Sequence, residues 1–315
     1  SPKQGNYKCG IPVSLLKKGK LMKTFSMREK KKRYAGYTLV APAIILLIIT
    51  FLVPMAYSLM ISLSSSDGII ANHFEWVGLE NYISVLKNSK FQEAFFHTCF
   101  FVVTTIMLEL ALGFFISLLL NRETKGSRVF KLILALPLMV APVVSGLQWR
   151  WLFADQYGII NHLLSLLGIE APLWFTSANG AWTTIIVANL WLATPFVILV
   201  LLAGLGGLSE EMNEAAQIDG ANGWQIFWKI TLPQLKSTIL IILVIRLTDA
   251  FRIYDLIYIL TGGGPGGRTE VLSTYIYKRI FTDWEFGKGQ AASFLVMLFI
   301  MGLSLLCNKL MEEKE

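Results

Sequence analysis

The sequence predicts an all-α membrane protein with six transmembrane helices. Of its 315 residues, 54% are hydrophobic and only 16% are charged, whereas average soluble proteins carry about 25% charged residues. Six long apolar runs alternate with polar segments, and each run is long enough to cross a bilayer as a helix. These observations exclude an ordinary soluble domain and favour a chain that crosses the membrane several times.

A basic segment, residues 1–36, precedes the first apolar run. Eleven of the 28 Lys and Arg residues lie between Lys3 and Arg33. Positive charge beside a span is typical of its cytoplasmic end. The net charge of +7 is therefore explained by membrane topology and does not indicate a nucleic-acid partner. We expect residues 1–36 to form a cytoplasmic arm that contacts anionic lipid, with a specific partner site as the alternative.

The first span is predicted over residues 37–63, because no charge occurs between Arg33 and Asp67. A basic region ahead of an apolar run is also typical of a signal peptide, but this run is too long for one. We therefore expect a retained membrane helix. Pro42 and Pro54 are expected to kink this helix or to break its ends.

The second span, residues 95–120, contains Glu109 near its middle. An ionised carboxylate is costly inside a bilayer unless it faces protein or water. We expect Glu109 to hydrogen-bond a neighbouring helix, with contact to a transported solute as the alternative. The turn that follows, residues 121–128, is basic and is therefore assigned to the cytoplasm.

The third and fourth spans are predicted over residues 130–153 and 181–205. Two prolines lie inside the third span, and Asn189 and Pro195 interrupt the fourth. Counting spans from the cytoplasmic N-terminus places the next polar segment, residues 207–236, in the cytoplasm.

The fifth span, residues 237–260, carries four charged side chains spaced three residues apart: Arg246, Asp249, Arg252 and Asp255. On one continuous helix, successive members are neighbours of opposite sign. Four charges cannot face lipid, so this face is expected to lie against protein or a transport pathway. A short outer helix, Leu272 to Phe281, leads to the uncharged sixth span, residues 289–308, and residues 312–315 form a cytoplasmic tail.

Residues 207–236 predict two short helices joined by a sharp turn. Glu214 begins a run of strong helix formers, and Gly220 permits the turn because glycine alone adopts a positive φ without strain. The second helix is predicted from Gly223 to Ile230, ended by Pro233.

This segment resembles the signature loop of ABC-importer permeases. The matching pattern is E-A-A, a Gly six residues after the Glu, nine further residues, and then I-x-L-P. The run E-A-A-x-x-D-G-A-x-x-W-Q-I-F-x-K-I-T-L-P is similar to the maltose-type sugar branch, and the resemblance covers residues 37–308. It implies a type I importer permease fold with a cytoplasmic coupling helix that docks on an ATPase. The residues expected to make this coupling are Glu214, Ala215, Ala216, Asp219 and Gly220.

The resemblance also implies partners. These are a second homologous permease subunit, two ATPase subunits and an extracytoplasmic solute-binding protein, assembled in a bacterial plasma membrane with both termini of this chain in the cytoplasm. Nineteen of the 28 Lys and Arg residues fall in segments assigned to the cytoplasm and six in outer segments, which supports that orientation. The sequence contains no Walker A motif, so ATP and Mg²⁺ are expected on the ATPase subunits. The chain is expected to be a translocation subunit with no metal site or cofactor of its own, and no enzyme in itself.

The sugar pathway of maltose-type permeases lies in the spans that flank the signature loop. Alignment from Glu214 outward without gaps, together with the neighbouring charge, places these residues on that pathway: Asn189, Ala193, Phe196, Arg246, Asp249, Ala250, Arg252 and Ile253. Phe196 is suited to stack on a sugar face. Two interpretations of the charges remain: a ladder that pairs with itself or with the partner permease, or an Arg246 or Arg252 that meets an anionic solute such as a uronate-containing oligosaccharide.

A different class of function is also considered. A secondary transporter or channel that works alone can carry charged residues inside its spans. Inverted repeats are expected in many such folds, and none is evident in this sequence. A membrane-embedded enzyme would need a nucleophile or metal constellation, for which the sequence offers no motif.

Overall fold

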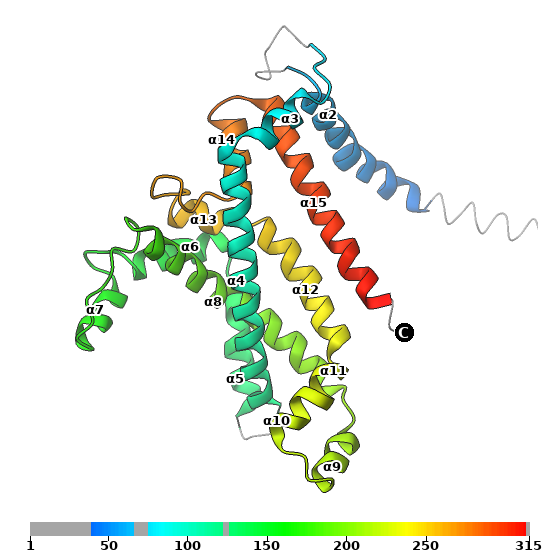
Figure 1. Cartoon of the computed structure of the whole chain (residues 1–315), viewed down its shortest axis with the longest axis vertical. Helices are drawn as coiled ribbons and strands as arrows, with labels where there is room; N and C mark the ends of the chain where they lie inside the picture. Colours follow the sequence, from blue (N-terminus) through cyan, green and yellow to red (C-terminus); the bar gives the residue numbers. More distant parts are fainter. Residues whose placement is uncertain (1–38, 66–74, 122–125, 313–315) are drawn as a thin grey trace, which may run out of the picture. The chain divides into compact units, whose positions relative to one another are not determined.

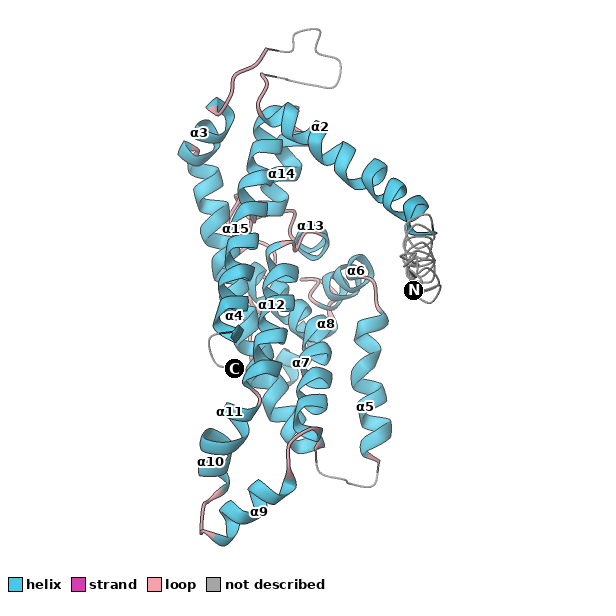
Figure 2. Ribbon diagram, turned by 90° about the vertical axis from the view of Figure 1, so that its right-hand side faces the viewer, coloured by secondary structure: helices cyan, strands magenta, loops and turns pink. Residues whose placement is uncertain are grey.

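A computed structural model describes residues 39–65, 75–121 and 126–312 (Figure 1). The predicted basic arm, residues 1–36, and the middle of the turn at residues 121–128 lie outside the described residues. Within them the structure consists of helices and the loops that connect them (Figure 2). Ser64 and Trp76 form an isolated antiparallel bridge. The described residues divide into two compact parts, the first ending at residue 60 and the second beginning at residue 61.

The described helices include four that are each long and apolar enough to cross a membrane: Leu39–Ser62, Ser89–Leu120, Ala178–Gly206 and Phe286–Lys309. Two further helix pairs meet the same criteria together, but each pair is sharply bent. Counting each bent pair as one span gives six, in agreement with the predicted all-α membrane fold.

The first span is a continuous helix that includes the π-helical turn η1 (Ile48–Leu52) and α2 (Val53–Ser62). Pro54 lies at the second residue of α2 and does not end the helix. Proline has no N–H to donate to the preceding turn, and π-helical turns are one way in which a helix adjusts to such a gap.

The second span, α4 (Ser89–Leu120), follows the short helix α3 (Glu80–Lys87). It begins six residues before the predicted start, because the Asn88 side chain accepts hydrogen bonds from the backbone N–H groups of Lys90 and Phe91. This is the ordinary N-cap of a helix, and it allows a polar first turn ahead of the apolar run.

The third predicted span, residues 130–153, is sharply bent in the structure. The chain forms α5 (Ser127–Ala135), a 3₁₀ turn η2 (Leu136–Met139) and α6 (Pro142–Leu152), with a bend of 100°. Ala141 is extended because a residue before proline is sterically driven out of the helical region, and Pro142 then starts the new helix.

The fourth span, α8 (Ala178–Gly206), covers the predicted range and follows a short helix, α7 (Ile159–Leu166). Four short helices come next: α9 (Glu210–Ile218), α10 (Gly223–Ile226), η3 (Phe227–Thr231) and α11 (Leu232–Gln234). Pro233 does not end the second of the two predicted helices. It lies in the first turn of α11, where its missing N–H costs little, and the chain bends by 66° at Leu235 instead.

The fifth predicted span, residues 237–260, is also interrupted. Helix α12 (Lys236–Phe251) ends before a turn at residues 252–254, and α13 (Asp255–Leu260) follows. The helix α14 (Leu272–Phe281) has the predicted bounds, and α15 (Phe286–Glu312) contains the sixth predicted span.

Helices α4, α8, α12 and α13 share the main apolar core, which includes Phe101, Ile185, Ala250 and Ile257. A second core joins α3, α14 and α15 to the start of α4. Both views show α4 running from the end that holds α3 and α14 toward the end that holds α9 and α10 (Figures 1 and 2). The fold thus places the signature segment at one end of the second part.

Candidate functional site

The signature segment has the geometry that its sequence predicts. Helix α9 ends with two hydrogen bonds, from Gly220 N to Gln217 O and from Ala221 N to Ala216 O, at 3.0 and 2.9 Å. This is a Schellman motif, which requires a positive φ at the residue after the cap. Gly220 supplies that conformation with a φ of +80°.

Helix α10 starts at Gly223, and a capping box between Asn222 and Gln225 holds its first turn. The Asn222 side chain accepts from Gln225 N, and the Gln225 side chain accepts from Asn222 N, both at 2.9 Å. The two helices are therefore held at a defined angle by hydrogen bonds on both sides of one glycine.

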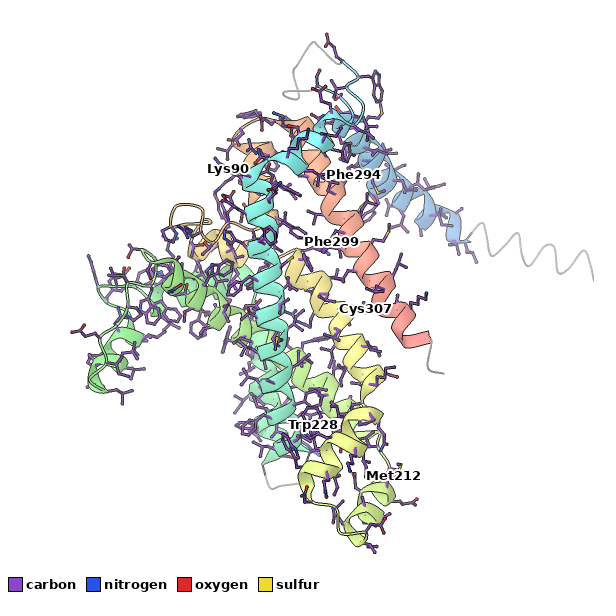
Figure 3. All side chains as sticks on the ribbon, in the orientation of Figure 1. Lys90, Met212, Trp228, Phe294, Phe299 and Cys307 are labelled. Carbon is purple, nitrogen blue, oxygen red and sulfur yellow. The ribbon has the colours of Figure 1, made fainter. Side chains whose placement is uncertain are left out.

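Helix α9 leaves apolar side chains uncovered at the end of the second part. Met212 is 50% exposed and Ile218 is 87% exposed. Glu214, Ala215, Asp219 and Gly220 are also exposed, and Ala216 is half-buried. Figure 3 shows Met212 and Trp228 at this same end, on the two arms of the segment. The predicted coupling residues thus form an accessible surface with both apolar and acidic groups.

A polar cavity of about 540 Å³ lies between α8, α12 and the start of α13. All eight predicted pathway residues line it: Asn189, Ala193, Phe196, Arg246, Asp249, Ala250, Arg252 and Ile253. The three on α8 are spaced by four and three residues, which places them on one face of that helix. A larger and predominantly apolar groove lies between α12, α14 and α15 and shares Arg252 and Tyr254 with the cavity.

An ion pair crosses from α12 to α4 beside this cavity. Arg246 donates from Nε to Glu109 Oε2 at 2.7 Å and from Nη2 to Glu109 Oε1 at 3.0 Å. The side chain of Glu109 is fully buried, and that of Arg246 is 9% exposed. A fork-shaped guanidinium that meets both carboxylate oxygens forms the strongest common type of protein hydrogen-bonded pair. Glu109 therefore accepts the expected hydrogen bond from a neighbouring helix.

The same carboxylate binds a third helix. Asn189 Nδ2 on α8 donates to Glu109 Oε1 at 2.9 Å. Glu109 therefore holds two residues that line the cavity, although no residue of α4 lines it. Sequence reasoning placed Glu109 against a neighbouring helix without naming its partner.

The predicted charge ladder exists only in its first step. Arg246 Nη1 donates to Asp249 Oδ2 at 3.3 Å, but α12 ends at Phe251, so Arg252 and Asp255 leave its helical spacing. In the part of the chain that the structure describes, neither the Arg252 nor the Asp255 side chain makes a hydrogen bond or ion pair. Both are exposed and line the cavity.

Seven further residues line the cavity and were not in the predicted pathway set: Leu138, Pro142, Leu192, Ile245, Tyr254, Asp255 and Leu256. Leu192 and Ile245 could have been found, because each lies four residues before a predicted pathway residue on the same helix. Leu138 and Pro142 could not, because they reach the cavity only through the bend between α5 and α6.

A charged cluster at the opposite end of the second part joins α14 to the start of α15. Glu285 accepts from Arg279 Nη1 at 2.7 Å and from Lys288 Nζ at 2.8 Å. Burial alone would raise the pKa of Glu285, but the hydrogen bonds and charges of Lys288 and Arg279 outweigh it and lower this pKa below its usual range.

Comparison with known proteins agrees with this architecture. Residues 109–311 match the family described as binding-protein-dependent transport system inner membrane component. The chain is 34% identical over 274 residues to the trehalose/maltose transport system permease protein MalF of Thermococcus litoralis, covering 87% of this chain and 92% of the relative. It is 32% identical over 286 residues to the sulfoquinovosyl glycerol transport system permease protein SmoG of Agrobacterium fabrum, covering 90% and 92%.

A solved structure shares the fold. A chain of a bacterial alginate ABC transporter, crystallised with an alginate-bound periplasmic protein, superposes with a TM-score of 0.79 at 23% identity, covering 91% of this chain and 96% of that one. The family match, the relatives and the helical architecture lead to one conclusion: this multi-pass membrane protein belongs to the binding-protein-dependent inner membrane components, as a carbohydrate ABC-importer permease.

Proposed function

We propose that the chain is the permease subunit of an ATP-driven importer that moves a neutral di- or oligosaccharide through the cavity between α8 and α12. The proposal rests on how the chain connects the cavity to the signature segment. Helix α8 ends at Gly206 and α12 begins at Lys236, so the two long helices that line the cavity are those joined by the signature segment.

Tight packing at the base of α8 and α12 supports transmission of movement. A Cβ on Gly204 of α8 would lie 2.9 Å from Leu235 Cδ2 and 2.8 Å from Thr238 Oγ1. The two helices therefore approach closely where the signature segment leaves them. Packed interiors transmit displacement because they contain few voids.

In the proposed cycle, α9 docks on an ATPase subunit that binds ATP and Mg²⁺. Closure of two such ATPases moves α9, and the helices around the cavity turn from an inward-open to an outward-open arrangement together with a second, homologous permease. A solute-binding protein then delivers its sugar from the outer side, and both termini of this chain lie in the cytoplasm. ATP favours the outward-open state only through contacts that differ between the two states.

The polar groups of the cavity suit hydroxyl groups. Asp249 and Asp255 offer carboxylate acceptors, Arg252 offers donors, and Phe196 and Tyr254 supply rings beside them. Such a mixture of apolar surface with a few placed polar groups is typical of small-molecule sites. With Glu109 included, the site holds two guanidinium groups and three carboxylates, a formal net charge of −1, which disfavours an anionic solute.

One observation favours an acidic sugar as the second candidate. Arg252 is exposed to the cavity and has no partner among the described side chains, so it is free to pair with a carboxylate or sulfonate. A relative named for sulfoquinovosyl glycerol, whose sugar bears a sulfonate, shows that the family includes permeases named for anionic solutes.

The test is solute-stimulated ATP hydrolysis by the complete transporter in proteoliposomes, for Arg252→Gln and for the control Arg268→Gln. Arg268 is an exposed arginine that does not line the cavity. For a neutral sugar, we expect Arg252→Gln to raise the half-saturating concentration by about tenfold or less, the scale of one lost hydrogen bond to a charged group. Loss of all stimulation by an acidic sugar in Arg252→Gln would instead favour the second candidate. Absence of stimulation by any carbohydrate in the unaltered transporter would contradict the proposed function.

A further inference from the structure

Glu109 reaches the transport cavity only through other residues, yet it touches two of the polar groups that line it. Its carboxylate accepts two hydrogen bonds from Arg246 and one from Asn189. It is fully buried on α4, and the cavity is lined by other helices. Glu109 is therefore distinct from the residues of the proposed coupling surface, which are at the end of the second part, and from the predicted pathway residues, which line the cavity themselves.

We infer that Glu109 is a positioning residue that sets the charge selectivity of the cavity. This inference rests on the proposed function and extends it. Glu109 neutralises Arg246, so that the guanidinium beside the cavity does not act as a free anion-binding group. It also fixes the amide of Asn189, whose Nδ2 is committed to the carboxylate.

The Asn189 amide shows the consequence for the solute. Since Nδ2 donates to Glu109, Oδ1 is the polar atom of this side chain that remains for the cavity. It has no hydrogen-bond partner among the described residues. An amide oxygen accepts hydrogen bonds and cannot donate them. The site therefore presents an acceptor at Asn189, which suits a sugar hydroxyl and repels a carboxylate.

Glu109 also orients the Arg246 guanidinium. Two of its nitrogen atoms face Glu109, and the third, Nη1, donates to Asp249 Oδ2. The side chain of Asp249 is 57% exposed and lines the cavity. Glu109 thus uses Arg246 to hold an acceptor carboxylate toward the solute, and the two acceptors on α8 and α12 share one buried anchor.

Stability alone is a poor explanation for this arrangement. Replacing a buried ion pair by well-packed apolar residues is often neutral or stabilising, because two charges must be removed from water to form it. A pair that only joined α4 to α12 would not need an additional bond to Asn189 or to an exposed carboxylate. Both extra bonds lead to the cavity.

The charge chemistry predicts an asymmetry between the two partners. In Glu109→Gln, Arg246 stays charged because a guanidinium is not deprotonated in proteins, so the cavity gains a positive charge. In Arg246→Gln, the guanidinium itself is absent, so the cavity gains no positive charge. A merely structural pair would instead respond alike to the loss of either partner.

The experiment measures equilibrium binding of trehalose and of a uronic-acid disaccharide prepared from alginate to the detergent-purified complete transporter. Omitting the solute-binding protein removes its own selectivity from the result. The variants are Glu109→Gln, Arg246→Gln and the double variant. The matched control is Thr105→Val, which removes a buried hydroxyl from the same helix, one turn away, whose hydrogen bonds go only to the backbone of α4.

We expect Glu109→Gln to shift the ratio of the two dissociation constants toward the acidic disaccharide by about tenfold or more, the effect of one uncompensated charge at short range. The ratios of the other three variants should not shift toward the acidic disaccharide. Equal ratios in Glu109→Gln and Arg246→Gln would overturn the inference. If Glu109→Gln does not assemble, Glu109→Asp replaces it. The shorter side chain keeps its charge but draws the carboxylate away from Arg246 and Asn189, so a smaller shift of the ratio in the same direction is expected, and an unchanged ratio there would also overturn the inference. An unchanged ratio of the two dissociation constants in every variant would contradict this inference alone. An unaltered protein that binds no carbohydrate would contradict the proposed function as well.

Discussion

Arg246 on α12 and Glu109 on α4 are 137 positions apart and are joined by two hydrogen bonds of 2.7 and 3.0 Å. The pair lies at the junction of three helices, because Asn189 of α8 binds the same carboxylate. It explains how two ionisable groups are accommodated inside membrane-spanning helices without facing lipid.

Removing one partner of this pair is expected to be costly. Glu109→Ala leaves a buried guanidinium without its counter-ion, which destabilises a protein by about 3–5 kcal/mol. The double variant Glu109→Leu with Arg246→Met removes both charges and should cost far less. Thermal unfolding of the purified transporter checks this, and a double variant as unstable as Glu109→Ala would show that the charges themselves are needed for folding.

The close approach of α4 and α8 depends on Gly113. A Cβ at this position would lie 2.6 Å from Val197 Cγ1, closer than atoms can pack. We expect Gly113→Ala to destabilise the transporter by about 1–3 kcal/mol, the usual range for overpacking. Gly302→Ala on α15 is the control, because nothing lies within 4 Å of its added Cβ. Equal unfolding temperatures for the two variants would contradict the packing described between α4 and α8.

The turn at Gly220 tests the coupling segment without a steric clash. No atom lies within 4 Å of a Cβ built there, but the φ of +80° is unfavourable for alanine by about 1 kcal/mol or more. Gly220→Ala should therefore reorient α9 and reduce solute-stimulated ATP hydrolysis while the transport helices stay folded. Gly223→Ala, equally uncrowded and without a positive φ, should retain activity. Full activity in Gly220→Ala would show that the angle between α9 and α10 is not important for coupling.

The cluster around Glu285 predicts sensitivity to acid. Because its pKa is lowered in the folded protein, the stabilisation that Glu285 provides is complete above its unfolded pKa of about 4.3 and is lost as the pH falls through the lower folded value. Unfolding should therefore become easier below about pH 4.5. Glu285→Gln should be less stable than the unaltered protein at neutral pH, and the difference should shrink toward low pH. A pH-independent difference in unfolding temperature would contradict this account.

Local signals in the sequence predict much of the fold. Helix α14 has the predicted bounds, Leu272–Phe281, and the Gly220 turn follows directly from the need for a positive φ. The break near Pro142 was readable in principle, because proline drives the preceding residue out of the helical region. The end of α12 at Phe251 was not, because the next three residues contain no glycine or proline, so no local signal marks the break.

The sequence predicted most of the residues that line the candidate site, but it did not predict which charged side chains pair with one another. All eight predicted pathway residues line one cavity. Helical spacing places three of them on α8 and three on α12, whereas Arg252 and Ile253 lie in the turn that follows α12. That Arg246 is held by Glu109 while Arg252 is free depends on contacts between helices distant in sequence. Opposite charges in two spans indicate that each needs a partner, but they do not specify which groups meet.

The central claim is that α9 connects this permease to ATP hydrolysis on another subunit. The most direct measurement is gentle purification of the chain from its native membrane, identification of the co-purifying proteins by mass spectrometry, and assay of sugar uptake in liposomes. Glu214→Ala tests the docking surface, and Glu211→Ala, an exposed carboxylate on the same helix outside the signature, is its control. The account predicts a second permease and a Walker A ATPase, with ATP-dependent uptake and the ATPase both lost in Glu214→Ala but not in Glu211→Ala. A chain that purifies alone and transports sugar without ATP would contradict it and would indicate a transporter that works by itself.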